Sequence, residues 1–276
     1  MKNLKSCQWL AQHLNKVHVL DAGIVKPGVN KPYSPTAIIA GAKRFDISGA
    51  LTNPKVSLPN TMCDSAQFQA AMRQLGINLH DTVVVYDDMS LFSAPRAWWM
   101  LKSMGFEQVY VLDGGLSHWL ALGLPTAPSY AITTQVGNFV AKAQPNYFID
   151  SQQVLQSIND KSICLLDARS AKRFSGEDPE PRCNMRSGHI PNSKNLPYQQ
   201  ILNEQGLVKS VDALQALFTE CGITNQALQF SCGSGVTACI LAMAADECGY
   251  AQLSVYDGSW SEWGQPSNLP VEIGAN

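Results

Sequence analysis

Cys232 is the residue whose type and neighbours best suit nucleophilic chemistry in this chain. It follows a strand-like run at 228–231 and precedes an apolar helical pattern at 239–245, with Gly233 and Gly235 in the intervening turn. Two glycines allow the backbone to fold tightly around the sulfur, and the N-terminus of a helix stabilises an anion. These surroundings favour the nucleophilic thiolate over the thiol. We therefore predict that Cys232 is a reactive thiolate rather than a small core residue.

A second group of candidate site residues lies in the segment 168–191, directly after another predicted strand. Ligands of open parallel α/β sheets bind beyond the carboxyl ends of the strands, so this segment and the Cys232 turn are expected on the same side of one sheet. Arg173 and Arg182 can then reach one substrate. Because a guanidinium binds planar oxygens in pairs, two arginines suit a carboxylate next to a polarised carbonyl group.

The other charged residues of this segment are assigned more general roles. Arg169 and Arg186 are interpreted as solvated surface residues. Asp178 and Glu180 either orient the two site arginines or are solvated loop charges. His189 begins a strand-like segment, and we expect it to form structural hydrogen bonds.

Ser234, two residues after Cys232, invites comparison with a serine–histidine–aspartate triad that would use His189. A triad requires a nucleophile in contact with its base, and the spacing does not indicate such a contact. We interpret Ser234 as a loop hydroxyl that donates to the sulfur or to a substrate oxygen. The segment 257–260 and its counterpart at Asp113 are interpreted as turn and packing motifs.

The composition favours a globular protein that handles a small molecule. The 276 residues carry a formal net charge of −2, which suits two domains and does not indicate binding to nucleic acid or to an anionic membrane. There is no run of about 18 apolar residues and no leader with a cleavage site, so we expect a cytoplasmic protein. The eight cysteines include no Cys-x-x-Cys pair, which indicates neither a zinc site nor a disulfide framework.

An imperfect internal repeat relates the two halves of the chain. Three landmarks recur in the same order: a strand ending in aspartate, a second apolar strand, and an Asp-Gly turn followed by a tryptophan. The paired positions are Asp21 with Asp167, Asp87 with Cys232, and Asp113 with Asp257. Because the first half has an aspartate in place of Cys232, it cannot perform thiolate chemistry and is expected to form one wall of a cleft.

Strand and helix patterns alternate in both halves. The strands are continuously apolar, which is typical of parallel sheets buried on both faces. Helical patterns cover 65–75, 95–104 and 211–221, and each is followed by a glycine. We predict an α/β protein with two tandem domains, each a mainly parallel sheet flanked by helices.

The predicted boundary between the domains lies in a stretch of loop and extended character. We place the inactive domain at residues 1–125, a linker at 126–145 and the catalytic domain at 146–276.

Several of these motifs together resemble the tandem-domain rhodanese family over essentially the whole chain. They are the duplicated α/β pattern, Arg173 followed by Phe174, the Pro-Glu-Pro-Arg segment ending at Arg182, Gly-His-Ile-Pro at 188–191, and Cys-Gly-Ser-Gly-Val-Thr at 232–237. Within this family, the loop is most similar to that of the 3-mercaptopyruvate sulfurtransferases. Thiosulfate-using members typically carry basic residues where Gly233 and Ser234 stand, because a doubly charged donor requires cations near the sulfur.

This resemblance implies two tandem rhodanese-like domains and a two-step sulfur transfer. The Cys232 thiolate would attack the sulfur of 3-mercaptopyruvate and release pyruvate as an enolate, and the resulting persulfide would pass its outer sulfur to cyanide, a thiol or thioredoxin. No metal or organic cofactor is implied. The implied catalytic residues are Cys232 and Ser234, and the implied substrate-binding residues are Arg173, Arg182, Gly233, Gly235, Val236 and Thr237.

One segment of the first half departs from the family. The family often has His-Ile-Pro-Gly-Ala there, and its histidine has been proposed to join the loop serine in a triad. This chain has Ile-Ile-Ala-Gly-Ala at 38–42, so the triad is not carried over to Ser234.

Three alternative functions remain. Thiosulfate could be the donor, although the uncharged loop disfavours it. A phosphatase whose anion-binding loop begins with cysteine would require an arginine at the position of Ala238. A persulfide carrier that delivers sulfur to a protein partner would have the same sequence features as the enzyme.

Overall fold

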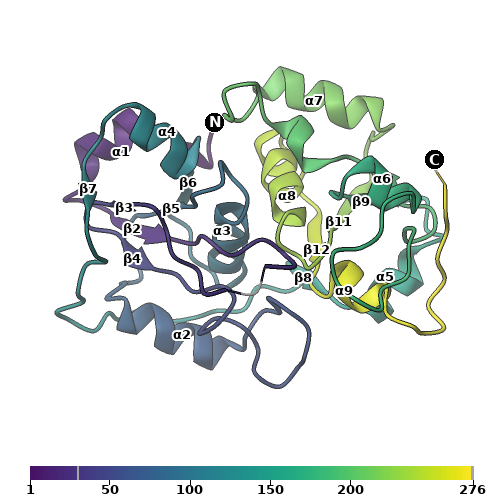
Figure 1. Cartoon of the computed structure of the whole chain (residues 1–276), viewed down its shortest axis with the longest axis horizontal. Helices are drawn as coiled ribbons and strands as arrows, with labels where there is room; N and C mark the ends of the chain where they lie inside the picture. Colours follow the sequence, from purple (N-terminus) through teal and green to yellow (C-terminus); the bar gives the residue numbers. More distant parts are fainter. Residues whose placement is uncertain (30, 275–276) are drawn as a thin grey trace.

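Each half of the chain folds around a five-stranded parallel sheet, in a computed structural model that describes residues 1–29 and 31–274 (Figure 1). The first sheet has the order β1-β6-β5-β2-β4 and the second has the corresponding order β8-β12-β11-β9-β10. The strands are β1 (Leu4–Lys5), β2 (His18–Asp21), β4 (Lys43–Arg44), β5 (Val83–Tyr86), β6 (Val109–Leu112), β8 (Phe148–Ile149), β9 (Ile163–Asp167), β10 (Lys194–Asn195), β11 (Ala227–Ser231) and β12 (Leu253–Tyr256). The predicted fold class and the internal repeat are thus confirmed.

Helices cover both faces of each sheet, which explains why the strands are continuously apolar. In the first domain Val83 and Val85 face one helical layer, whereas Val84 and Tyr86 face the other, as the alternation of side chains along a strand requires. The helices are α1 (Cys7–His13), α2 (Ser65–Gln74), α3 (Ala94–Ser103), α4 (Gly115–Ala121), α5 (Ser151–Ser157), α6 (Ala171–Ser175), α7 (Val211–Glu220), α8 (Ala238–Glu247) and α9 (Ser259–Trp263), with a 3-10 turn η1 at Tyr198–Ile201. Within the described part of the chain, no helix has the length and apolar character needed to cross a bilayer.

The predicted helices are confirmed as α2, α3 and α7, and local sequence accounts for their ends. The Asp64 side chain accepts a hydrogen bond from the Gln67 amide at the start of α2, and Ser210 caps α7 in the same way. Gly76 follows α2 with a φ of 74°, a conformation that glycine adopts without steric cost.

Residues 126–145, expected to be a linker, run in extended form along the first domain. Within this segment β7 (Thr126–Ala127) pairs with β3 (Ile38–Ile39) in a small antiparallel sheet. Further on, the Phe139 amide donates to the Ile77 carbonyl, and the Phe139 ring is fully buried. The segment is therefore tied to the first domain along its length, and the exact domain bounds stay a prediction.

The two domains share one hydrophobic core where the equivalent helices α3 and α8 pack against each other (Figure 1). Polar contacts reinforce this packing. The amide of Asn3 donates to Glu247 (2.6 Å), and the amide of Val208 donates to Asp113 (3.0 Å). These contacts fix the position of the two domains relative to each other.

Candidate active site

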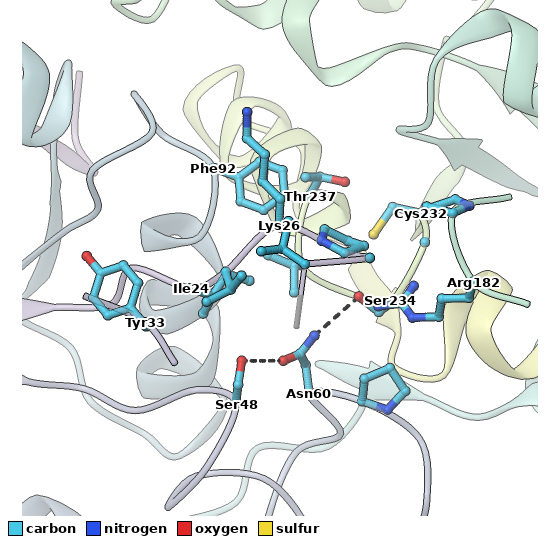
Figure 2. Close-up of a pocket in the computed structure, with 18 of the residues that line it drawn as sticks. Ile24, Lys26, Tyr33, Ser48, Asn60, Phe92, Arg182, Cys232, Ser234 and Thr237 are labelled. Atoms are coloured by element: carbon cyan, nitrogen blue, oxygen red, sulfur yellow. Dashed lines mark hydrogen bonds between the residues drawn. The ribbon is translucent and has the colours of Figure 1, made fainter. Parts of the chain in front are cut away.

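A cavity of about 810 Å³ lies between the domains, at the carboxyl ends of the second-domain strands. The second domain contributes Cys232 and the segments around Arg173 and Arg182, and the first domain contributes Ile24, Tyr33 and other residues (Figure 2). The expectation that the first domain forms one wall of a cleft is confirmed. In the described part of the chain, no group of three or more metal-ligating side chains is found.

Cys232 follows the last residue of β11 and lies at the cavity wall, with only 1% of its surface exposed. The turn after β12 anchors it: the Cys232 amide donates to Ser259 Oγ (3.2 Å), and the Trp260 amide donates to the Cys232 carbonyl (2.9 Å). Gly235 has a φ of 71°, and a Cβ there would lie 2.7 Å from the Asp257 carbonyl oxygen. The tight turn around the sulfur therefore requires glycine at position 235.

The backbone amides of residues 233–237 are available to an anion. Among the residues that the structure describes, none of these N–H groups donates to a backbone carbonyl or to a side-chain oxygen. They lead into α8, and the Thr237 side chain does not cap this helix. Unpaired amides at the start of a helix attract negative charge, so the loop can hold an anion that extends beyond the Cys232 sulfur.

The two predicted site arginines converge on this loop. A Cβ at Gly233 would lie 3.2 Å from Arg173 Nη2 and 3.8 Å from Arg182 Nη1, and both arginines line the cavity. Burial lowers the pKa of Arg182, and a thiolate at Cys232 would oppose this effect. Val236 and Thr237 also line the cavity, whereas Gly235 turns its carbonyl group toward the first domain.

Glu180 orients one of the two site arginines, Arg173, which agrees in part with one of the two interpretations left open. Its buried carboxylate accepts from Arg169 Nη1 (2.8 Å) and Arg173 Nε (3.2 Å) and pairs with Arg173 Nη2. Asp178 is exposed and takes the other role. Arg182 has no carboxylate partner within salt-bridge distance among the described residues, so it is the arginine more available to an anionic substrate.

The interpretation of Arg169 and Arg186 as solvated residues was wrong. Arg169 is 2% exposed, pairs with Asp167 (2.6 Å) and stacks on Trp260, so it is a buried, fixed part of the cavity wall. Arg186 is half-buried and donates to the backbone carbonyls of Trp263 and Leu269. Both arginines satisfy buried polar groups, and this long-range role is not visible in the local sequence.

The structural role predicted for His189 is confirmed. Its ring is buried, stacks on Phe174 with centroids 3.8 Å apart, and bonds through Nδ1 to the Phe174 carbonyl (2.9 Å). No hydrogen bond joins His189 to Ser234 in the described structure.

Ser234 contacts an asparagine of the first domain rather than any residue of the 38–42 segment. Asn60 Nδ2 donates to Ser234 Oγ (3.3 Å), and Ser48 Oγ donates to Asn60 Oδ1 (2.8 Å), as Figure 2 shows. Asn60 is 8% exposed and has a φ of 59°, which asparagine tolerates better than most residues. Ser234 is thus paired with an amide of the first domain rather than with a histidine.

Arg96 of α3 joins the first domain to the back of the Cys232 loop. Its guanidinium is fully buried and donates to the Gly235 carbonyl (3.2 Å), the Asn60 carbonyl (2.7 Å) and Asp257 Oδ1 (2.7 Å). The second oxygen of Asp257 accepts from the Met62 amide (2.8 Å). The reading of the 257–260 segment as only a turn and packing motif was therefore incomplete.

Sequence reasoning missed Asn60, Arg96 and Ser259. Asn60 and Arg96 act across a long separation along the chain and belong to no motif that the sequence analysis recognised. Ser259 lies in the 257–260 segment, which was interpreted only as a turn and packing motif. The one usable signal was the repeat, because it placed an Asp-Gly turn at Asp257 at the end of a strand next to β11.

Comparison with known proteins agrees with this architecture. The family described as Rhodanese-like domain matches residues 6–122 and again residues 150–266. The 3-mercaptopyruvate sulfurtransferase of Escherichia coli (strain K12) is 38% identical over 272 residues, which cover 96% of this chain and 95% of that protein. The thiosulfate sulfurtransferase of Rattus norvegicus is 37% identical and covers 94% of this chain and 91% of its own length.

Solved structures show the same similarity along the chain. The crystal structure of SseA from Escherichia coli, described as a 3-mercaptopyruvate sulfotransferase with the rhodanese fold, has a TM-score of 0.84 at 34% identity and covers 95% of this chain and 100% of its own. The Tum1 protein from Saccharomyces cerevisiae has a TM-score of 0.87 at 26% identity, with 99% of both chains covered. The chain therefore belongs to the rhodanese family and contains two copies of its domain, of which the second has a cysteine, Cys232, at the end of its central strand.

Proposed function

We propose that the protein is a sulfurtransferase that takes sulfur from 3-mercaptopyruvate, stores it as a persulfide on Cys232 and passes it to a thiophilic acceptor. The observation that carries this proposal is the distribution of charge around Cys232. The loop itself holds uncharged Gly233 and Ser234, whereas Arg182 and Arg173 lie to one side of it. This arrangement suits a donor with an uncharged sulfur and a carboxylate one carbonyl group away.

The first step forms one S–S bond and breaks one S–C bond. The Cys232 thiolate attacks the donor sulfur, and the electron pair of the S–C bond leaves with the three-carbon fragment as pyruvate enolate. The proton of the donor thiol balances the charge when it reaches the enolate carbon, which gives pyruvate and an anionic persulfide. The free amides of residues 233–237 are the groups that would stabilise this anion.

In the second step an acceptor attacks the outer sulfur, and Cys232 leaves as a thiolate. Cyanide is the acceptor in an assay, and a thiol or reduced thioredoxin is the proposed acceptor in a cell. All eight cysteines are unpaired, which fits the reducing cytoplasm that we propose as its location. We assign the chemistry to residues 146–276, with the first domain completing the cavity.

Thiosulfate is the second candidate donor, because a relative named thiosulfate sulfurtransferase is nearly as similar as the mercaptopyruvate enzymes. The two donors are separated by sulfur transfer to cyanide, measured with each donor in parallel and with the Cys232→Ser protein as the blank. Preference for 3-mercaptopyruvate supports the proposal. Preference for thiosulfate contradicts it, and no transfer from either donor favours a persulfide carrier.

A further inference from the structure

The chain of hydrogen bonds from Ser48 through Asn60 to Ser234 crosses the domain interface and ends beside Cys232. Ser48 Oγ donates to Asn60 Oδ1 (2.8 Å), and Asn60 Nδ2 donates to Ser234 Oγ (3.3 Å). Asn60 and Ser234 are both more than nine-tenths buried, and Ser234 lines the cavity. Little water therefore competes for either group.

The backbone of Asn60 is also held in place. Its carbonyl accepts from Arg96 Nη2 (2.7 Å), and the same guanidinium binds the Gly235 carbonyl in the Cys232 loop (3.2 Å). Arg96 thus ties the backbone of Asn60 to the backbone of the loop, while the amide of Asn60 reaches the loop side chain. Two separate contacts hold the amide against Ser234.

The direction of these bonds determines what Ser234 can do. A hydroxyl has one proton and two lone pairs, and here one lone pair accepts from Asn60. The Ser234 proton is left to point elsewhere, and Ser234 Oγ faces the cavity that holds Cys232 (Figure 2). A hydroxyl that already accepts a hydrogen bond is also a stronger donor.

We propose that Asn60 is a positioning residue that makes Ser234 a hydrogen-bond donor to the anion formed in the cavity during sulfur transfer. That anion is either the sulfur on Cys232 or the enolate oxygen of the departing three-carbon fragment. An amide has no proton that titrates in water, so Asn60 cannot serve as a base for Ser234, and the serine is a donor rather than a nucleophile. The identity of the enolate oxygen rests on the proposed function. The direction of the hydrogen bonds from Ser48 to Asn60 and from Asn60 to Ser234 does not depend on it.

Replacing Asn60 by aspartate reverses the direction while keeping the shape of the side chain. A carboxylate accepts only, so it draws the Ser234 proton away from the cavity. We expect kcat to fall by roughly a hundredfold in Asn60→Asp, the size of effect expected for losing one preorganised donor. Asn60→Ala leaves the proton free and lowers kcat by only about tenfold. The KM for the sulfur donor stays within about twofold in both variants, because the arginines are unchanged.

Combining these variants with Ser234→Ala separates positioning from a general effect of charge or fold. If Asn60 acts through Ser234, then Asn60→Asp causes no further loss in the Ser234→Ala protein. Losses that multiply in the double variant overturn the inference, as does an Asn60→Asp protein as active as the unsubstituted one. Asn159→Asp, which adds the same charge on the exposed surface, is the matched control.

Alkylation of Cys232 by iodoacetamide, followed on its peptide by mass spectrometry, gives a readout that requires no sulfur donor. A rate that changes equally in Asn60→Asp and Ser234→Ala identifies the sulfur as the anion. An unchanged alkylation rate together with a reduced kcat identifies the enolate oxygen as the anion to which Ser234 donates. If the unsubstituted protein transfers no sulfur, the proposed function fails and alkylation alone decides: equal rates in all proteins overturn the inference.

Ser48→Ala provides a second test if the Asn60 variants do not fold, because Ser48 is exposed and its loss removes only the outer bond of the chain. We expect a fall in kcat of about threefold that is absent in the Ser234→Ala background. The same threefold fall in both backgrounds, or no fall in either, overturns the inference.

Discussion

The loops after the central strands β5 and β11 are equivalent in fold and opposite in chemistry. In the first domain the carboxylate of Asp87 accepts hydrogen bonds from the amides of Met89 (2.9 Å), Ser93 (2.8 Å) and Ala94 (2.7 Å). In the second domain Cys232 holds the same place, and the amides of residues 233–237 donate to no backbone carbonyl or side-chain oxygen among the described residues. The first loop satisfies its amides with a carboxyl group of its own, and the second is open to an anion from the cavity.

This difference shows how one duplicated fold can provide both a candidate active site and the support for it. An aspartate at the strand end satisfies the turn internally and makes the loop a fixed part of the core, since Asp87 is fully buried. A cysteine leaves the turn unsatisfied, so additional contacts must hold it in shape. The first domain supplies these contacts through Arg96 and Asn60.

The largest expected effect follows from removing the sulfur. Cys232→Ser should lower sulfur transfer by about a thousandfold or more, because a serine hydroxyl is a far weaker nucleophile at neutral pH and cannot form a persulfide. Transfer to cyanide measures this effect. Cys183→Ser changes an exposed cysteine and should keep full activity; equal loss in both variants would show that the reactive cysteine had been assigned wrongly.

The next effect concerns the support that the first domain gives to the second. Arg96→Met should reduce the free energy of unfolding by about 3 to 5 kcal/mol, because it leaves Asp257 partly buried without its cation. Urea unfolding measures this loss, and Lys55→Met on the exposed surface is the control. A loss below about 1 kcal/mol would mean that Arg96 does not hold the domains together.

The two site arginines should differ from each other in substrate binding. Arg182→Ala should raise the KM for 3-mercaptopyruvate by about thirtyfold, whereas Arg173→Ala should raise it less, because Glu180 already pairs with Arg173. Steady-state kinetics with both donors test this order. Lys172→Ala replaces an exposed neighbouring cation and should leave KM unchanged. A larger rise in KM for Arg173→Ala than for Arg182→Ala would show that Arg173, although paired with Glu180, binds the substrate more strongly.

The smallest effect is expected in the inactive loop. Asp87→Asn should destabilise the protein by about 1 to 2 kcal/mol, because an amide oxygen cannot accept all three backbone bonds. Sulfur transfer should remain within about twofold of the unsubstituted protein. Thermal unfolding and the cyanide assay measure the two effects. A large loss of activity without a loss of stability would refute the purely structural role of this loop.

The reactive loop and the scaffold around it could be predicted because they depend on residues close together in the chain. Apolar strands, helices that end at glycine and a Cys-Gly-x-Gly turn are patterns of local backbone preference, and they identified β11, α8 and Cys232. The repeat extended this reasoning to the first domain. The position of Arg173 and Arg182 after a predicted strand, together with the family resemblance, pointed to these two arginines, which the structure places beside Gly233.

Only the tertiary structure showed what holds the loop. Arg169 was expected at the surface but is buried against Asp167 and Glu180, and no local pattern marked Asn60 or Arg96 as neighbours of Cys232. Whether a charged or polar side chain is solvated or buried depends on which other segments surround it after folding. The sequence by itself therefore determined the fold and pointed to Cys232 as the candidate nucleophile. The packing of two domains determined which first-domain residues hold its loop, because those residues lie far from the loop in the chain and meet it only at the interface.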